Sequence, residues 1–180
     1  MSPPFESLGL FRRSSADRSE NATDILAIRV VGEPLAVRFD AISGVLGLSN
    51  HRRLVRVPGA DPALLGVVAV RGVVMPVFSL ADLLGVTGPR EHLWFAWIDG
   101  KNPVGYAFDG IDGRAWLPPE ALGGGDNGHP LLWGAALFAG TSRPLLHLDD
   151  GVQTSRAFAS QNGAYGDHAG ANTRLARAAA

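Results

Sequence analysis

Short apolar runs occur in pairs along the first half of the chain, and turn residues separate the two members of each pair. The runs are rich in Val and Ile and too short for helices, so they predict β-strands joined as hairpins. The two turns are Gly32-Glu33-Pro34 and Arg71-Gly72. The four runs cover residues 25–31, 35–39, 65–70 and 73–78.

The second half continues this pattern after one predicted helix. Ser79 is a favourable N-cap and Gly85 a favourable stop, so we predict a short helix that ends at Leu84. Further apolar runs are separated by turn residues at 99–102 and 140–143. Many short strands with frequent turns favour an all-β barrel or sandwich with only minor helix. These later runs cover residues 93–98, 104–108, 131–138 and 145–148.

Matching residues recur 68 or 69 positions later in the chain. The repeat predicts two related halves, each a small β-barrel, with a groove between them. Because these residue types are common in all-β chains, chance recurrence is the alternative. The matched pairs are Pro34 and Pro103, Phe39 and Phe108, Gly66 and Gly134, Pro76 and Pro144, and Leu80 and Leu148.

Composition divides the chain into three regions. Residues 1–24 are polar and predict a flexible leader. Residues 25–150 hold nearly all of the periodic apolar pattern, with the first barrel at about 25–90 and the second at about 91–150. Residues 151–180 are rich in Ala, Gly, Ser and Asn, and they predict a disordered tail because they bury too little surface to offset the entropy of ordering.

The overall composition fits a folded cytoplasmic protein. It is 46% hydrophobic and 18% charged, as is typical of a globular chain. The absence of cysteine excludes disulfides and thiolate metal sites. No apolar stretch approaches the about 20 residues of a membrane span, and the leader lacks the apolar core of a signal peptide, so we expect no membrane insertion. A net charge of −1 gives no reason to expect a nucleic-acid partner.

No residue pattern indicates catalysis. The five histidines are scattered without ligand spacing, and the Gly-rich segment 123–128 lacks the Lys-Ser/Thr of a phosphate-binding loop. Asp40 and Asp109 occupy matching places after strands, where turn or cap roles explain them better than a catalytic pair does. We therefore expect a protein that is not an enzyme and has no cofactor and no metal.

One basic cluster supports an alternative function. Arg52, Arg53 and Arg56 follow the first predicted strands, and on a small β-barrel such a cluster can hold single-stranded nucleic acid. Such sites need aromatic side chains interleaved with the charges, and none lies between Leu46 and Phe78. A solvated loop, or a rim for an acidic partner, is favoured over the nucleic-acid-binding module.

The centre of the chain carries a recognisable motif. Pro58 is followed by Leu65-Gly66-Val67, an apolar strand, Arg71-Gly72 and Pro76-Val77. This order resembles the CheW-like domain family, and the segments 42–46, 104–111 and 145–149 resemble it as well. The resemblance covers about residues 25–150 and implies two five-stranded β-barrel halves around a shared apolar core. That architecture agrees with the repeat.

The resemblance also implies a function. Members of the family are adaptors that couple chemoreceptors to the histidine kinase CheA and catalyse nothing, and related proteins serve type IV pilus twitching. The expected partners are therefore the regulatory domain of a CheA-type histidine kinase and the cytoplasmic tip of a chemoreceptor. The expected setting is chemotaxis or a related motility pathway.

Partner-binding residues follow from the same resemblance. Arg71 and Gly72 occupy the signature turn between two strands, and a guanidinium there suits a carboxylate on a partner, with an ordinary solvated turn as the alternative. Four further positions would lie near the kinase- and receptor-binding surfaces. They are Ile42, Val45, Leu65 and Val67.

Three positions depart from the family pattern. Ala69 stands where the family often has Asn, and Ser79-Leu80-Ala81 replaces the usual Asp-Leu-Arg. Gly44 stands where Glu is frequent, which predicts that Arg71 lacks a carboxylate partner within the chain. The apolar scaffold is intact, so these changes bear on the partners and not on the fold.

Overall fold

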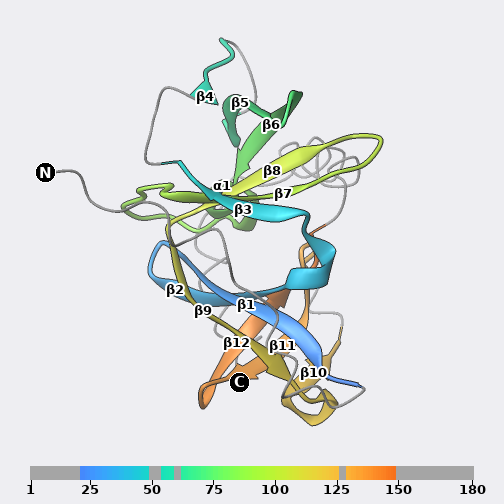
Figure 1. The fold of residues 1–180 in the computed structure, drawn as a ribbon. Coiled ribbons are helices and arrows are strands. Elements are labelled where there is room, and N and C mark those ends of the chain that lie inside the picture. The colour runs from blue at the N-terminus through green and yellow to red at the C-terminus, as the bar shows by residue number, and fades with distance from the viewer. Residues whose placement is uncertain (1–20, 49–53, 59–61, 126–128, 149–180) are drawn as a thin grey trace, which may run out of the picture.

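The chain forms two six-stranded β-sheets that pack against each other, with one short helix beside them (Figure 1). The computed structural model describes residues 21–48, 54–58, 62–125 and 129–148. Sheet A contains, in spatial order, β10 (Leu122–Gly124), β11 (Leu132–Phe138), β12 (Thr141–Leu146), β2 (Glu33–Arg38), β1 (Thr23–Val30) and β9 (Gly110–Leu117). Sheet B contains β3 (Gly44–Gly47), β7 (Trp94–Ile98), β8 (Val104–Phe108), β6 (Val73–Ser79), β5 (Leu64–Val70) and β4 (Leu54–Val55).

The two sheets are built alike, strand for strand. Each contains two antiparallel hairpins that meet through one parallel pair, β12 with β2 in sheet A and β6 with β8 in sheet B. Leu145 pairs with Ala36 in the first, and Val77 pairs with Gly105 in the second. Leu145 comes 68 positions after Val77, and Gly105 comes 69 positions after Ala36. The parallel pairs of the two sheets are therefore made by residues that match in the sequence repeat.

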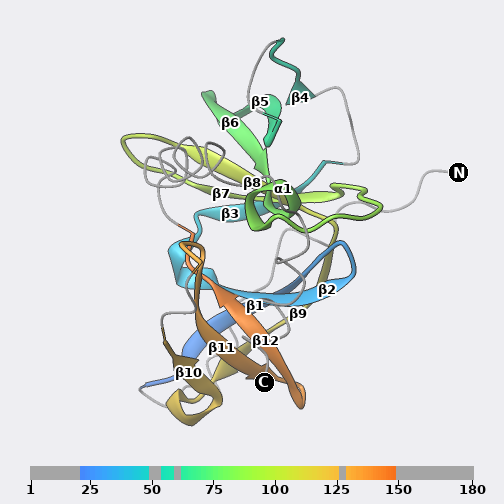
Figure 2. The same ribbon diagram turned by 180° about the vertical axis from the view of Figure 1, so that it is seen from behind.

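The sheets divide the chain differently from the sequence repeat. The β1–β2 hairpin belongs to the first repeat but pairs with β12 and β9, while the β7–β8 hairpin belongs to the second and pairs with β6 and β3. Each sheet therefore combines a hairpin of one repeat with the remaining strands of the other. The view from behind shows the same exchange (Figure 2).

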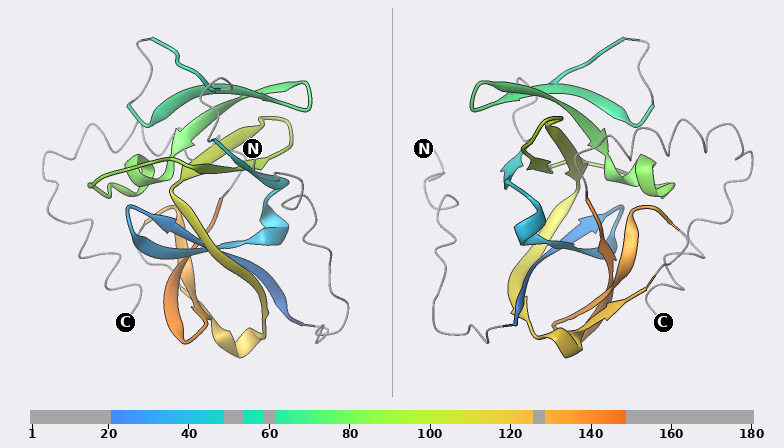
Figure 3. Two further views of the ribbon diagram at one scale, coloured as in Figure 1. Left: turned by 60° about the vertical axis from the view of Figure 1, so that its left-hand side comes forward. Right: turned by 90° about the vertical axis from the view of Figure 1, so that its right-hand side faces the viewer.

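Three apolar clusters stabilise this arrangement. One lies inside sheet B and contains Val68, Met75 and Trp97, and one lies inside sheet A and contains Ile25 and Leu145. The third and largest lies between the sheets, with side chains from β1, β2, β7, β8 and the helix α1 (Leu80–Leu84). Strands at distant positions of a sheet share its inner cluster, so each sheet is strongly curled, as the two further views show (Figure 3). The expected pair of small barrels around a shared apolar core is confirmed.

Residues of the central hairpins alternate between two of these clusters. In β8, Val104, Tyr106 and Phe108 face the shared cluster, while Ala107 faces the interior of sheet B. A strand buried on both faces has no polar side chains to alternate with apolar ones. This explains why the sequence shows continuous apolar runs there.

Several expectations need correction. Each sheet has six strands and not five, because the very short strands β4 and β10 add an edge. β1 begins at Thr23, so Asp24 belongs to the folded part and is buried in an ion pair with Arg114. Residues 1–20 of the expected leader and the expected tail from residue 151 lie outside the described residues.

The turns of the β1–β2 and β11–β12 hairpins are shorter than expected, whereas the turn at Arg71 and Gly72 lies where it was predicted. Val31 and Gly32 have φ angles of 53° and 79°, Ala139 and Gly140 have 49° and 78°, and Arg71 and Gly72 have 52° and 84°. Positive φ at both central positions defines a tight two-residue turn whose twist matches that of the strands. Residues 33–34 and 141–143 therefore belong to strands. The predicted helix is confirmed, with the Ser79 hydroxyl accepting from the Asp82 N–H and Gly85 ending the helix in the left-handed conformation.

Candidate partner-binding surface

Strands β4, β5 and β6 form one end of sheet B, and the outward side of this end is apolar and exposed. Cross-strand pairing places Val55, Val67 and Pro76 in one row, and Ala69 and Val74 in the next. Val55 and Val74 are 63% and 65% exposed, while Val68, Met75 and Val77, which point to the other side, are buried inside sheet B. Contiguous apolar side chains that stay in water mark an interaction site. We call these five residues the β5–β6 face.

Arg71 places a positive charge at the tip of this face. Its side chain is exposed, and Gly72 beside it is open, since a Cβ there would meet nothing within 4 Å. Among the described residues, no carboxylate lies within ion-pair distance of Arg71. Its guanidinium carbon instead lies 5.8 Å from the centre of the Trp97 ring. A cation next to exposed apolar side chains is suited to a partner that has both an apolar patch and a carboxylate.

The other expected site residues differ in exposure. Val67 is half-buried at the centre of the β5–β6 face, and Leu65 is half-buried against the interior of sheet B. Val45 is half-buried on β3 and packs against the shared cluster. Ile42 is 8% exposed and belongs to that cluster. Ile42 therefore belongs to the core and offers little surface to a partner.

The curl of sheet B brings two of the expected regions together. β3 and β5 lie near opposite edges of the sheet, but Trp97 pairs with Gly44 on β3 while its ring lies beside Arg71. Arg71 therefore approaches the segment around Val45, whereas Leu65 lies at the far end of β5.

A second apolar face occupies the equivalent place on sheet A. Trp133 and Leu137 on β11 are each 52% exposed, and the neighbouring edge strand presents Gly123 and Gly124 without side chains. The two faces lie at opposite ends of the molecule, at the top and the bottom of Figure 1. The sequence placed Val67 near a partner surface but showed neither the extent of the β5–β6 face nor the second face, because a continuous apolar run does not reveal which of its sides is covered. The large, isolated Trp133 was the one available signal.

A Ser, a His and an Asp meet near α1, but their contacts are structural. His92 Nε2 lies 3.0 Å from Ser79 Oγ, which is fully buried and also caps α1. The Asp109 carboxylate accepts from the backbone N–H groups of Val31, Glu91 and His92, not from the imidazole. Burial lowers the pKa of His92, against the opposing effect of Asp109. Asp109 thus joins two loops to β8, which supports the predicted cap role.

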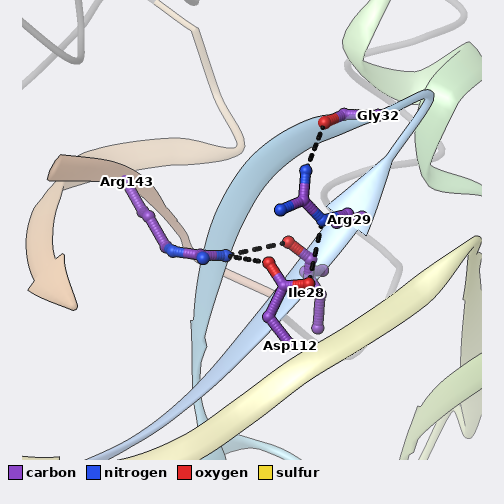
Figure 4. Close-up of polar contacts among 5 residues, drawn as sticks. All are labelled: Ile28, Arg29, Gly32, Asp112 and Arg143. Carbon is purple, nitrogen blue, oxygen red and sulfur yellow. Dashed lines mark hydrogen bonds and ion pairs between the residues drawn. The ribbon is translucent and has the colours of Figure 1, made fainter. Parts of the chain in front are cut away.

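A buried arginine forms the main polar contact inside sheet A (Figure 4). Arg143 is 6% exposed and donates to Asp112 at 2.8 Å, and Asp112 also accepts from Arg29 at 2.8 Å. Burial by itself raises the pKa of Asp112, but the hydrogen bonds from Arg143 and Arg29 outweigh it and hold that pKa below its usual range. The position equivalent to Arg143 in sheet B is Met75, which is equally buried.

The described ranges contain no group of three or more His, Asp or Glu side chains that is arranged to hold a metal ion. Likewise, the described part of the chain contains no helix long and apolar enough to cross a membrane. Arg56 is exposed beside β4, while Arg52 and Arg53 lie outside the described residues.

The fold and the two faces define a class of protein, a β-scaffold with two equivalent halves and an exposed apolar surface on each. The family model for the CheW-like domain matches residues 24–154, so the chain belongs to the CheW-like domain family. At the level of the family this means a non-catalytic scaffold of chemotaxis signalling. The expected family is therefore confirmed.

A solved structure supports the fold. The scaffolding protein TtCheW from Thermoanaerobacter tengcongensis superposes with a TM-score of 0.59 at 13% sequence identity, over 71% of this chain and 90% of the TtCheW chain. At this identity the likeness concerns the fold alone. Among curated proteins no match was found.

Proposed function

We propose that this protein is an adaptor that couples chemoreceptors to a CheA-type histidine kinase in the cytoplasm, in chemotaxis or a related motility pathway. The observation that carries the proposal is the β5–β6 face with Arg71 at its tip, in a chain of the CheW-like domain family. Interfaces of this kind depend on a few central anchors, for which exposed Val and Arg side chains are suited.

An adaptor has to hold two partners at the same time. The β5–β6 face and the face around Trp133 and Leu137 lie on different sheets, so two partners can bind without overlap. We propose the regulatory domain of the kinase as one partner and the cytoplasmic tip of the receptor as the other. Arg71, Gly72, Val45, Leu65 and Val67 remain the proposed contact region, with buried Ile42 supporting it from the core.

The test is reconstitution of coupled signalling from purified kinase, receptor and this protein. The rate of kinase autophosphorylation should rise only when all three are present. Val74→Glu places a charge on the exposed β5–β6 face and should abolish the rise, while Lys101→Glu, in the exposed β7–β8 turn, should leave it unchanged. A rise that does not depend on this protein would refute the adaptor function.

A further inference from the structure

Gly44, Trp97 and Arg71 lie beside one another in sheet B, and the proposed function does not by itself explain this arrangement. Gly44 pairs with Trp97 across β3 and β7. A Cβ on Gly44 would overlap the indole, with 2.6 Å to Cζ2 and 2.9 Å to Cζ3. On the tip of the β5–β6 hairpin, the Arg71 guanidinium lies 5.8 Å from the ring centre of the same indole.

The Trp97 ring attracts Arg71 without using its donors. A cation within about 6 Å of an indole centre is attracted by the electrostatic field of the ring, and this attraction takes up none of the guanidinium N–H groups. A carboxylate accepts two parallel hydrogen bonds from such a fork. Trp97 is only 4% exposed, so its orientation is set by the core and it gives Arg71 a rigid support.

The other half of the molecule lacks this arrangement, although its backbone is equivalent. The position equivalent to Arg71 is Ala139. The position equivalent to Trp97 is Ala27, which pairs with Ala36 on β2 as Trp97 pairs with Gly105 on β8. Ala27 in turn pairs with Gly113, so both halves have a glycine at this place. The fold alone therefore does not require an indole and an arginine beside that glycine.

We propose that Trp97 is a positioning residue, which holds Arg71 ready for a carboxylate of the partner, and that Gly44 is the residue that makes room for the indole. The proposal rests on the proposed function and names the partner group at its site. Among the described residues no carboxylate pairs with Arg71, and its neighbour is the Trp97 ring, so the charge of Arg71 stays available to the partner. The recognised group is an Asp or Glu side chain of the kinase regulatory domain.

NMR of the free protein tests the support directly. The Hδ protons of Arg71 should be shifted upfield by the ring current of Trp97, and the shift should persist in Trp97→Phe, which keeps a flat ring. It should disappear in Trp97→Leu and in Gly44→Ala, where the added methyl displaces the indole. Arg71 protons at ordinary positions in the wild type would overturn the proposal without any binding experiment.

Calorimetric titration with the kinase regulatory domain tests the consequence. Trp97→Leu should weaken binding by about 3-fold to 10-fold, and Trp97→Phe should restore most of the affinity. In an Arg71→Gln background the same Trp97→Leu change should have no further effect, because Trp97 acts through Arg71. An equal loss in that background would assign Trp97 a purely structural role and overturn the proposal. Melting curves show whether each variant is folded. If Trp97→Leu does not fold, Gly44→Ala is titrated in its place.

The carboxylate is identified by charge exchange. Exposed Asp and Glu residues of the kinase domain are changed one at a time to Lys, and each variant is titrated with Arg71→Glu. One of them should recover at least part of the affinity, and recovery by none would contradict a carboxylate partner. If the wild-type protein does not bind the kinase domain, the proposed function fails as well. If binding needs Arg71 but does not change when Trp97 is replaced, the inference about Trp97 is wrong while the proposed function stands.

Discussion

Arg143 is the residue whose burial most needs explanation. Its Nε has no hydrogen-bond partner among the described residues, and its charge is balanced by Asp112. Asp112 is the extra residue of a β-bulge in β9. It lies between Gly113, which pairs with Ala27 on β1, and Ile111, which pairs with Ile28. A bulge re-aims a side chain, and here it directs the carboxylate toward Arg143. The ion pair thereby links β9 to β12 across the interior of sheet A.

Removal of Asp112 should be costly because it leaves a buried cation alone. Asp112→Ala should lower the free energy of unfolding by about 2 kcal/mol, less than for a fully buried pair because Asp112 is partly exposed. The double variant Asp112→Ala/Arg143→Met should recover most of this loss, since methionine fills the equivalent position in sheet B. Urea denaturation measures both, with exposed Arg29→Ala as the nearly neutral control. A double variant no more stable than the single one would contradict the account.

His92 makes stability depend on pH. Burial lowers its pKa in the folded state, so the neutral imidazole is favoured by folding. The resulting stability is complete above the ordinary value of about 6.5 and is lost as pH falls through the lowered pKa. Asparagine tolerates the φ of 46° found at position 92 and does not titrate in this range. The His92→Asn variant should therefore lose less stability than the wild type between pH 7 and pH 5. Equal slopes in thermal melts at several pH values would show that His92 does not contribute.

At the scale of the element, two equivalent glycines allow the edge strands to approach. Gly66 follows a bulge in β5, and a Cβ there would overlap the carbonyl oxygen of Val55. Gly134 follows the matching bulge in β11, and its Cβ would overlap the carbonyl oxygen of Gly123. The glycine at this point of each repeat is therefore required by the short edge strands β4 and β10.

Alanine at either glycine should force the edge strand away. Gly66→Ala and Gly134→Ala should each cost about 1–3 kcal/mol of unfolding free energy. Gly123→Ala is the matched control, because its Cβ would lie 4.0 Å from the nearest atom and the change should stay within about 0.5 kcal/mol. Chemical denaturation ranks the three variants, and a similar loss in all of them would refute the close-approach explanation.

How far the elements could be predicted depends on their side chains. The strands of the central hairpins are largely apolar runs and were predicted, whereas β9 carries Asp112, Arg114 and a bulge, which interrupt its alternation. β4 and β10 have two and three residues, too few for any pattern. At the site, the Arg71-Gly72 turn is a local signal and was predicted. Contact of Arg71 with Trp97 depends on the curl of the whole sheet, which no local pattern contains.

At the scale of the whole molecule, the exchange of hairpins makes the two repeats interdependent. The β1–β2 hairpin finds its neighbours β12 and β9 only in the second repeat, and β6 finds its parallel partner β8 there as well. The largest apolar cluster also draws on both repeats. The sheets should therefore fold and unfold together.

Neither repeat should fold alone. Residues 21–90 and 91–148, expressed separately, should give poorly dispersed NMR spectra, because each loses strands on both sheets and most of the shared core. The full chain should unfold in one transition when followed both by far-ultraviolet circular dichroism and by tryptophan fluorescence. A well-dispersed spectrum from either repeat would show that the sheets do not depend on this exchange.

The central claim is that this scaffold binds a kinase through the β5–β6 face and Arg71. The most direct test is calorimetric titration of the protein with the regulatory domain of the CheA-type kinase from the same organism. The account predicts saturable binding to the wild type and to Lys101→Glu, and binding at least 10-fold weaker to folded Arg71→Glu, as expected for loss of a charge-assisted contact of about 1.5–3 kcal/mol. Equal affinity of all three proteins, or no binding at tens of micromolar by the wild type, would contradict it.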